Sequence, residues 1–342
     1  MSVKKPAPKQ ITLNEEQQSV VSAREGCYAV YAGPGSGKTF ACVQRMAALI
    51  REGVDPNEIL ALSFTATAAK NLKERVEVLT GPLSITRTAG SMTLHSLALK
   101  FVEEERNEFK FELAEFPLAT EPIANKLAGE SSRRFEVDPR SLRTVVSVHK
   151  RNRVRPAEAI HLAEDRLDPK QLKLALAYKD YEKRLRDNKV LDFDSIMLEM
   201  VELMSKNKEV RARHQYQFVT CDEGQDCCKT DWELLRLLSE EHGNLCVVGD
   251  PGQSVFGFRG ADPRLFLNME QMFPGTKKLY LATNYRSSRE LVQFLREIGP
   301  VKDLADKFTT PNGSGPEVSI RGFSSSGDEA AFVINCIKEG SA

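Results

Sequence analysis

The chain has 342 residues, a formal net charge of zero, and a composition that is 41% hydrophobic and 28% charged. At roughly 150 residues per domain this length suggests about two domains, and the composition is typical of a soluble globular protein. Seven cysteines occur without a Cys-x-x-Cys pair, which favours reduced thiols over a disulfide framework or a zinc site. The N-terminus has no apolar signal-peptide core, and no run reaches about 18 apolar residues. We therefore expect a cytoplasmic protein that has no membrane partner.

A glycine-rich loop lies between the first expected strand and the helix after it. Residues 27–32 form a short apolar run, which predicts a buried strand, and residues 38–50 predict a helix. Residues 32–39 read Ala-Gly-Pro-Gly-Ser-Gly-Lys-Thr, a P-loop with Ala32 in place of the usual glycine. Lys38 would reach the β- and γ-phosphates of ATP, and Thr39 would place its hydroxyl on Mg²⁺. Because such a loop wraps phosphates with backbone N–H groups, the expected binding residues are Gly33, Pro34, Gly35, Ser36, Gly37, Lys38 and Thr39. The alternative is a turn that binds nothing.

The expected elements alternate between strand and helix on both sides of a helical middle. Strands are expected at residues 59–64, 218–221, 245–248, 279–282 and 317–320, and further helices at 67–76, 287–298 and 327–338. This alternation predicts an α/β fold with a parallel sheet covered on both faces. The middle, from about residue 101 to 204, carries helical patterns only. Its segment 131–190 holds 16 Lys and Arg against 9 Asp and Glu. That excess is either a solvated surface or a face that follows a phosphate backbone.

An acidic pair follows the strand expected at residues 218–221. Asp222 and Glu223 open the segment Asp-Glu-Gly-Gln-Asp. In a chain with a P-loop, an Asp at the carboxyl end of a strand is the expected second anchor of Mg²⁺. The adjacent Glu223 could accept a proton from the attacking water. The alternative is a polar turn, which the presence of the P-loop disfavours.

Several segments resemble, in order and spacing, the motifs of UvrD-like superfamily 1 DNA helicases. They are residues 13–17 (the Q motif), 32–39 (motif I), 63–69 (Ia), 93–96 (Ib), 222–226 (II), 249–261 (III) and 284–288 (IV). The resemblance runs from about Leu13 to the C-terminus and covers the N-terminal part of such a helicase. It implies ATP and Mg²⁺ as cofactors.

The resemblance also implies roles in the nucleotide site. Gln17 would read the adenine and Tyr285 would stack on it. Gln253 would sense the γ-phosphate or orient water, and Arg286 would be an arginine finger that stabilises transition-state charge from across a cleft. The implied catalytic residues are Lys38, Glu223, Gln253 and Arg286, the implied metal ligands are Thr39 and Asp222, and the implied ATP-binding residues outside the P-loop are Gln17, Tyr285 and Arg286.

The same resemblance implies a path for single-stranded nucleic acid. Phe64, Phe256 and Phe258 would stack on bases, and His95 and Arg259 would lie near the strand. Phe256 and Phe258 stand where the family commonly has tyrosine and tryptophan. Both keep a π-face, but they lack the hydroxyl and the indole N–H. Taken without the motifs, the aromatic residues would more often be core residues.

The resemblance implies two RecA-like units. The first would span residues 11–276 with a helical insertion at about 102–206, and residues 277–342 would begin a second lobe. Motifs V and VI of the second lobe are not found in the sequence. We therefore expect either a piece of a longer protein or a reduced form, so that a C-terminal continuation or a partner would supply these motifs.

The function implied is an ATP-dependent DNA helicase or translocase that acts on single-stranded DNA, or on DNA with a single-stranded tail, in the 3′ to 5′ direction. The alternative is an ATP-dependent module that binds single strands without unwinding. A P-loop kinase or GTPase is disfavoured because Gln17, Gln253 and Arg286 fall in helicase order.

Overall fold

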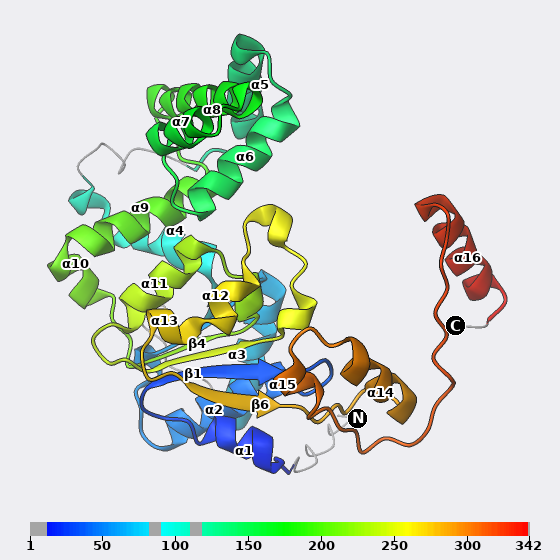
Figure 1. Cartoon of the computed structure of the whole chain (residues 1–342). Coiled ribbons are helices and arrows are strands. Elements are labelled where there is room, and N and C mark those ends of the chain that lie inside the picture. The colour runs from blue at the N-terminus through cyan, green and yellow to red at the C-terminus, as the bar shows by residue number, and fades with distance from the viewer. Residues whose placement is uncertain (1–11, 82–89, 110–117, 341–342) are drawn as a thin grey trace, which may run out of the picture.

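The computed structural model describes residues 12–81, 90–109 and 118–340 and contains one six-stranded parallel sheet. The strands lie in the order β3-β2-β4-β5-β1-β6, so that each chain connection crosses over a face of the sheet (Figure 1). Their bounds are β1 (Cys27–Ala32), β2 (Ile59–Ser63), β3 (Gly90–Thr93), β4 (Phe218–Cys221), β5 (Leu245–Gly249) and β6 (Lys277–Leu281). The expected α/β fold with a parallel sheet is confirmed.

Strand β1 shows why this sheet is covered on both faces. Successive side chains of a strand point to opposite faces. Tyr28 and Val30 enter one hydrophobic cluster, whereas Ala29 and Tyr31 enter the other. Both sets are buried, which explains the continuous apolar run of a central parallel strand.

Helices cover each face of the sheet. One face packs against α1 (Glu15–Val21), α2 (Lys38–Arg51) and α3 (Ala66–Thr80). The other packs against α4 (Leu94–Glu104), α9 (Phe193–Lys206), α10 (Lys208–Arg213), α11 (Lys229–Ser239), α12 (Pro263–Leu267) and α13 (Met269–Met272). Among the described helices, none combines the length and the apolar character that a membrane span requires.

Four helices of the middle segment form a separate body, which we call the four-helix insert. It consists of α5 (Glu121–Phe135), α6 (Pro139–Arg151), α7 (Pro156–Asp165) and α8 (Pro169–Asp187), which share their own hydrophobic cluster. Figure 1 shows this body at the top of the view, above the helices α4, α9 and α11. Helices α4 and α9, which contain the two ends of the expected insertion at 102–206, pack with the sheet instead. The four-helix insert, which runs from α5 to α8, therefore covers fewer residues than the insertion expected at 102–206.

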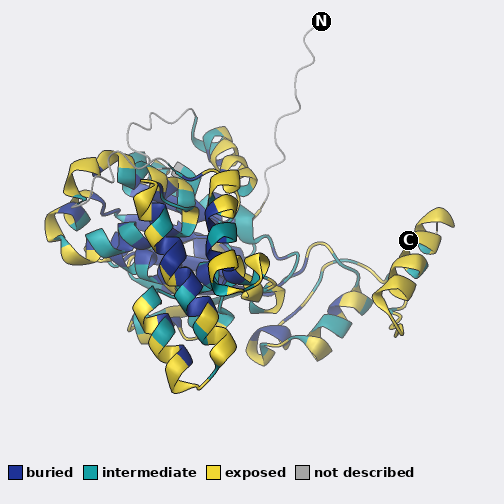
Figure 2. Cartoon of the chain, turned by 90° about the horizontal axis from the view of Figure 1, so that it is seen from above, coloured by how far each residue is buried: buried dark blue, intermediate teal, exposed yellow. Residues whose placement is uncertain are grey.

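The segment expected to begin a second lobe divides in two. Strand β6 pairs in parallel with β1 and is the edge strand of the first sheet, although it starts at residue 277. Helices α14 (Arg289–Ile298) and α15 (Lys302–Ala305) still contribute Val292, Leu304 and Ala305 to the sheet cluster. Beyond them, α16 (Ser326–Lys338) has no buried residue and lies apart from the body (Figures 1 and 2). The prediction of a strand at residues 317–320 is wrong, since this exposed segment pairs with no described strand.

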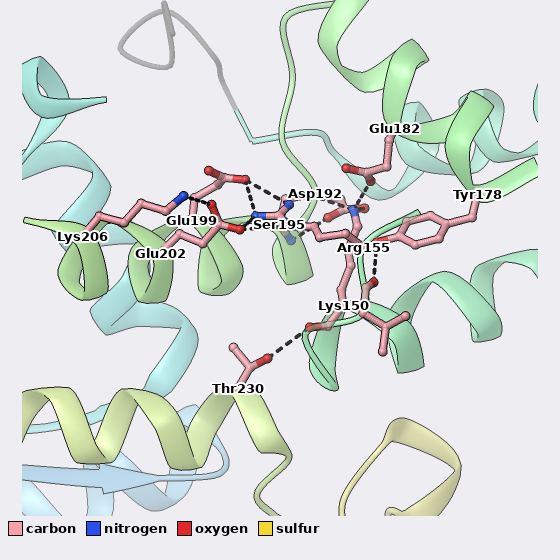
Figure 3. A network of polar contacts seen from close by, with 11 residues as sticks. Lys150, Arg155, Tyr178, Glu182, Asp192, Ser195, Glu199, Glu202, Lys206 and Thr230 are labelled. Atoms are coloured by element: carbon pink, nitrogen blue, oxygen red, sulfur yellow. Dashed lines mark hydrogen bonds and ion pairs between the residues drawn. The ribbon is translucent and has the colours of Figure 1, made fainter. Parts of the chain in front are cut away.

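A buried ion cluster joins the four-helix insert to α9 (Figure 3). The Lys150 side chain at the end of α6 is fully buried, and its Nζ lies 2.6 Å from Glu182 Oε1 and 2.7 Å from Asp192 Oδ2. It also donates to Ser195 Oγ at 2.8 Å. Burial alone would lower the pKa of Lys150, but the charges of Asp192 and Glu182 outweigh it and raise the pKa. The ammonium therefore stays charged and holds α6, α8 and α9 together.

Removal of this ammonium should destabilise the protein strongly. In Lys150→Met the carboxylates of Glu182 and Asp192 would stay buried without their cation, which typically costs about 3–5 kcal/mol. Urea unfolding at neutral pH measures the loss, and Lys170→Met, at an exposed position of α8, is the control. A Lys150→Met variant as stable as the control would contradict the assigned role of the cluster.

Candidate nucleotide and nucleic-acid site

The loops that follow the strands meet at one edge of the sheet, because all the strands run parallel. The loop at residues 33–37 follows β1, the segment 222–226 follows β4, and the segment 250–261 follows β5. Residues 282–288 follow β6 on the other side of β1. The structure therefore brings the residues of motifs I, II, III and IV together at this edge.

The glycine-rich loop turns sharply into α2. Helix α2 begins at Lys38, and its N-cap Gly37 has a φ of 84°, in the left-handed region that glycine tolerates. Gly35 also has a positive φ of 67°, and a Cβ at this position would lie 2.7 Å from Asn284 Oδ1. The backbone of the loop is therefore in close contact with Asn284 of motif IV. The backbone N–H groups at the start of α2 form a site for an anion such as a phosphate.

Lys38 lies between the phosphate loop and motif III. Its Nζ is 3.9 Å from Asp250 Oδ2, and both side chains are largely buried. Gln253 Nε2 donates to the same Asp250 oxygen at 2.6 Å. Two predicted site residues therefore meet on Asp250, to which the sequence analysis assigned no role. One signal was available, since Asp250 follows β5 directly, as Asp222 follows β4.

Asp222 faces α2 from the end of β4. Thr39 donates its hydroxyl hydrogen to Asp222 Oδ2 at 3.1 Å. Burial, with the charge of Glu223 as the next cause, raises the pKa of Asp222 to about 6. A buried carboxylate beside a hydroxyl offers the hard oxygen donors that Mg²⁺ prefers, and Mg²⁺ commonly takes only one or two protein ligands besides water and phosphate. The two residues therefore fit the cation.

Glu223 is held in a special backbone conformation by its surroundings. Its φ of 58° and ψ of 43° place it in the left-handed region. Gln225 Nε2 donates to Glu223 Oε2 at 2.8 Å, while Gln225 Oε1 accepts from the Asp250 N–H at 2.9 Å. Gln225 is almost fully buried and links motif II to motif III. Gln225 belongs to the segment Asp-Glu-Gly-Gln-Asp, but its contact with Asp250 of motif III was not predicted from the sequence.

The Q motif closes the other side of the loop. Asn14 caps α1 together with Gln17, and Gln17 Nε2 donates to the Ser36 carbonyl at 3.4 Å. Asn14 Nδ2 donates to the Tyr285 hydroxyl oxygen at 2.8 Å, and the Tyr285 N–H donates to the Gly35 carbonyl at 3.0 Å. Gln17 and Tyr285, predicted to bind adenine, therefore flank the same loop.

Arg286 stands beside the phosphate loop without an ion-pair partner among the described residues. Its backbone N–H donates to Asn284 Oδ1 at 2.8 Å, and so does the N–H of Ser287. Asn284 is buried, so this turn is fixed while the Arg286 side chain is exposed. A cation in this place can meet the charge of a bound phosphate.

The residues predicted to bind nucleic acid gather around a cavity of about 710 Å³. Phe64, His95, Phe258 and Arg259 line it, and they come from segments that follow β2, β3 and β5. The Phe256 ring stacks on the Phe64 ring, with ring centroids 4.9 Å apart and an angle of 29° between the planes. Phe258 is 69% exposed, which excludes a role as a core ring.

The cavity has further lining residues that the sequence analysis missed. Phe193, at the start of α9, lines it and meets the His95 ring edge-on at 6.0 Å. The Phe193 side chain is half exposed. Burial lowers the pKa of His95, and this effect outweighs the opposing charge of Asp231. His95 therefore offers a neutral ring near neutral pH.

Residues 13–274 match the model of the UvrD/REP helicase N-terminal domain. The chain is also similar to the "ATP-dependent DNA helicase PcrA" of Staphylococcus aureus (strain Mu50 / ATCC 700699), with 31% identity over 333 residues. A PcrA of Staphylococcus epidermidis (strain ATCC 12228 / FDA PCI 1200) is 32% identical over 335 residues. Each match covers 94% of this chain and 45% of the relative, so the chain spans about half the length of these relatives. The matched length and the motif geometry agree, and the chain belongs to the UvrD/REP helicase N-terminal domain family.

Proposed function

We propose that this chain is the ATP-binding part of a DNA helicase or translocase, which hydrolyses ATP with Mg²⁺ and moves 3′ to 5′ along single-stranded DNA. One observation carries the proposal. The polar cluster around Lys38 and the aromatic cavity around Phe64 lie at the same sheet edge, and the segment after β5 contributes to both. A change in the contacts at the phosphates can therefore be transmitted to the proposed path of the DNA strand through one segment, residues 250–261.

The nucleotide half of the proposal follows from the charges around the loop. Lys38 would leave Asp250 for the β- and γ-phosphates, because a phosphate offers more negative charge than one carboxylate. Thr39 and Asp222 would hold Mg²⁺, which supplies charge neutralisation of the phosphates when it is bound. Gln17 and Tyr285 would hold the adenine beside Ser36 and Gly35.

The hydrolytic step would use three residues around the phosphates. Glu223 would accept the proton of the attacking water, and Gln225 keeps that carboxylate in place. Gln253 would orient the water or contact the γ-phosphate from its position on Asp250. Arg286 would stabilise the charge that develops on the transferred phosphoryl group.

The partner we propose is a single strand of DNA, or DNA with a single-stranded tail. Phe64, Phe258 and Phe256 would offer faces on which bases stack, with His95 and Arg259 beside them. All seven cysteines lie in the described part of the chain and are free thiols, which suits a reducing compartment. The proposed place of action is therefore the cytoplasm.

Binding and chemistry should separate at two residues. Glu223→Gln should bind ATP normally, because the amide fits the site, but lose about a hundred-fold or more in turnover, because it accepts no proton. Lys38→Ala should lose ATP affinity itself. Titration with a fluorescent ATP analogue and steady-state ATPase with single-stranded DNA measure the two effects, with Glu164→Gln on the exposed face of α7 as the control.

Either of two results would contradict the nucleotide assignment. Wild-type turnover in Glu223→Gln would remove the proposed base, and wild-type ATP affinity in Lys38→Ala would remove the phosphate contact. A wild-type chain that binds ATP and DNA but never hydrolyses ATP would favour the single-strand-binding module over the translocase.

The strand path can be tested at Phe258. Base stacking on an aromatic ring is worth roughly 1–3 kcal/mol, so Phe258→Ala should weaken single-strand binding by about ten- to a hundred-fold. ATP affinity and Tm should stay unchanged, because the ring is largely exposed and its ring neighbour is Phe256, which lies outside the phosphate loop. Fluorescence anisotropy with an oligonucleotide measures the effect.

The matched control is Val78→Ala, which removes a similarly exposed apolar side chain from α3. It should bind DNA like the wild type. If Phe258→Ala binds the strand as tightly as Val78→Ala does, Phe258 is not in the DNA site.

A further inference from the structure

The cavity has a second wall, which differs chemically from the aromatic one. Helix α6 of the four-helix insert lines it with Arg140, Arg143, Thr144, Ser147 and Arg151. The intervals between these residues place them on one face of a helix. The face is about 16 Å long at 1.5 Å per residue, several times the roughly 3.4 Å of helix axis that each phosphate of one duplex strand occupies. It is therefore long enough to contact more than one phosphate.

The orientation of this face is fixed by buried residues on an adjacent side of α6. Leu142 and Val146 are buried in the core of the insert, and Lys150 is buried in the ion cluster of Figure 3. These three residues follow one another at intervals of four and form a single buried stripe. Because this stripe is fixed by packing and by charge, α6 cannot rotate its arginines away from the cavity without breaking the cluster.

The position of the wall is tied to the nucleotide site. Thr230 at the start of α11 donates its hydroxyl hydrogen to the Lys150 and Arg151 carbonyls, at 3.0 and 2.8 Å. Helix α11 follows motif II directly. On the other side, a Cβ on Gly260 of motif III would lie 3.4 Å from Arg151 Cβ, so these segments are in close contact. The end of α6 is thus held between the loops that carry Glu223 and Phe258.

The arginines at the open end of the face have charge to offer. Arg140 has no ion-pair partner among the described residues, and Arg143 has only an exposed contact with Glu121 at 3.6 Å. Exposed pairs of this kind contribute little and are readily exchanged. Elsewhere in the insert Arg134 and Arg184 share the nearly buried Asp180.

Three carboxylates that line the cavity are already engaged, and a fourth, Glu121, is the exposed partner of Arg143. Asp192 pairs with Lys150, and Asp194 pairs with Arg151 at 2.9 Å. Asp231 accepts from the Cys228 N–H at the start of α11. The face of α6 therefore offers guanidinium groups and hydroxyls, which are the donors that bind phosphate oxygens. The carboxylates of Asp192, Asp194 and Asp231 do not oppose them, because each has its own partner.

We propose that the Arg140–Arg151 face of α6 binds the phosphates of the single strand while Phe64 and Phe258 stack on its bases. The strand then lies between the two walls, with its bases toward the sheet and its backbone toward the four-helix insert. The proposal rests on the single-strand binding of the proposed function and adds the side from which the backbone is held.

The test uses the double variant Arg140→Gln and Arg143→Gln in the full chain. Its affinity for an oligonucleotide should fall about ten-fold at low salt. The slope of log affinity against log salt should become shallower by about 1.4, since each lost phosphate contact on a single strand contributes about 0.7. The matched control is Arg166→Gln with Lys170→Gln, which removes two exposed charges of the same insert away from the cavity. An unchanged slope in the α6 variant, or an equal loss in the control, would overturn the proposal.

An oligonucleotide with abasic sites separates the two walls. The α6 variant should lose the same factor on abasic and normal strands, because phosphates are present in both. Phe258→Ala should lose affinity only on the normal strand. If the α6 variant binds like the wild type while Phe258→Ala does not, this inference fails and the proposed function stands. A wild-type chain that binds no single strand would overturn both, and a loss seen only with duplex DNA would overturn the assignment to the single strand.

Discussion

The parallel strand order is the constraint on which the rest of this structure depends. Because β1 lies between β5 and β6, the phosphate loop is flanked by motif III on one side and by motif IV on the other. Strands β2 and β3 lie at the far end of the sheet, and so Phe64 and His95 stand away from the phosphates. The segment after β5 reaches both regions, with Asp250 beside Lys38 and Phe258 at the cavity. The two proposed binding regions are thereby arranged along a single edge.

Charges at this edge are buried and balanced against one another. Lys38 lies near Asp250, Thr39 donates to Asp222, and Gln225 connects Glu223 to the backbone of Asp250. Burial of an ionised group costs free energy unless the group has a partner. The charged and polar side chains of this site therefore contact one another. The triphosphate proposed for this site would take the place of these internal partners.

The four-helix insert is held to the sheet domain by polar contacts at one end of α6. Lys150 pairs with Glu182 and Asp192 inside the protein, and its own backbone carbonyl accepts from the Thr230 hydroxyl of α11. A buried ion cluster depends on geometry more strictly than apolar packing does, because a shifted partner leaves an uncompensated charge. The insert is therefore held in one position over the cavity, where its arginines face the aromatic residues.

The sequence by itself determined the local chemistry of this protein. The apolar runs before Gly33 and Asp222 predicted strands, and the Gly-Lys-Thr ending and the acidic pair predicted a nucleotide site, because these signals depend on neighbouring residues. Only the tertiary structure decided which distant residues meet. It placed β6 in the first sheet, Asp250 against Lys38, and Phe193 at the cavity. It also decided which face of α6 is exposed, because the ion pairs of Lys150 with residues 32 and 42 positions away fix that helix's rotation. Such contacts leave no periodic signal in the chain, whereas amphipathic helices do.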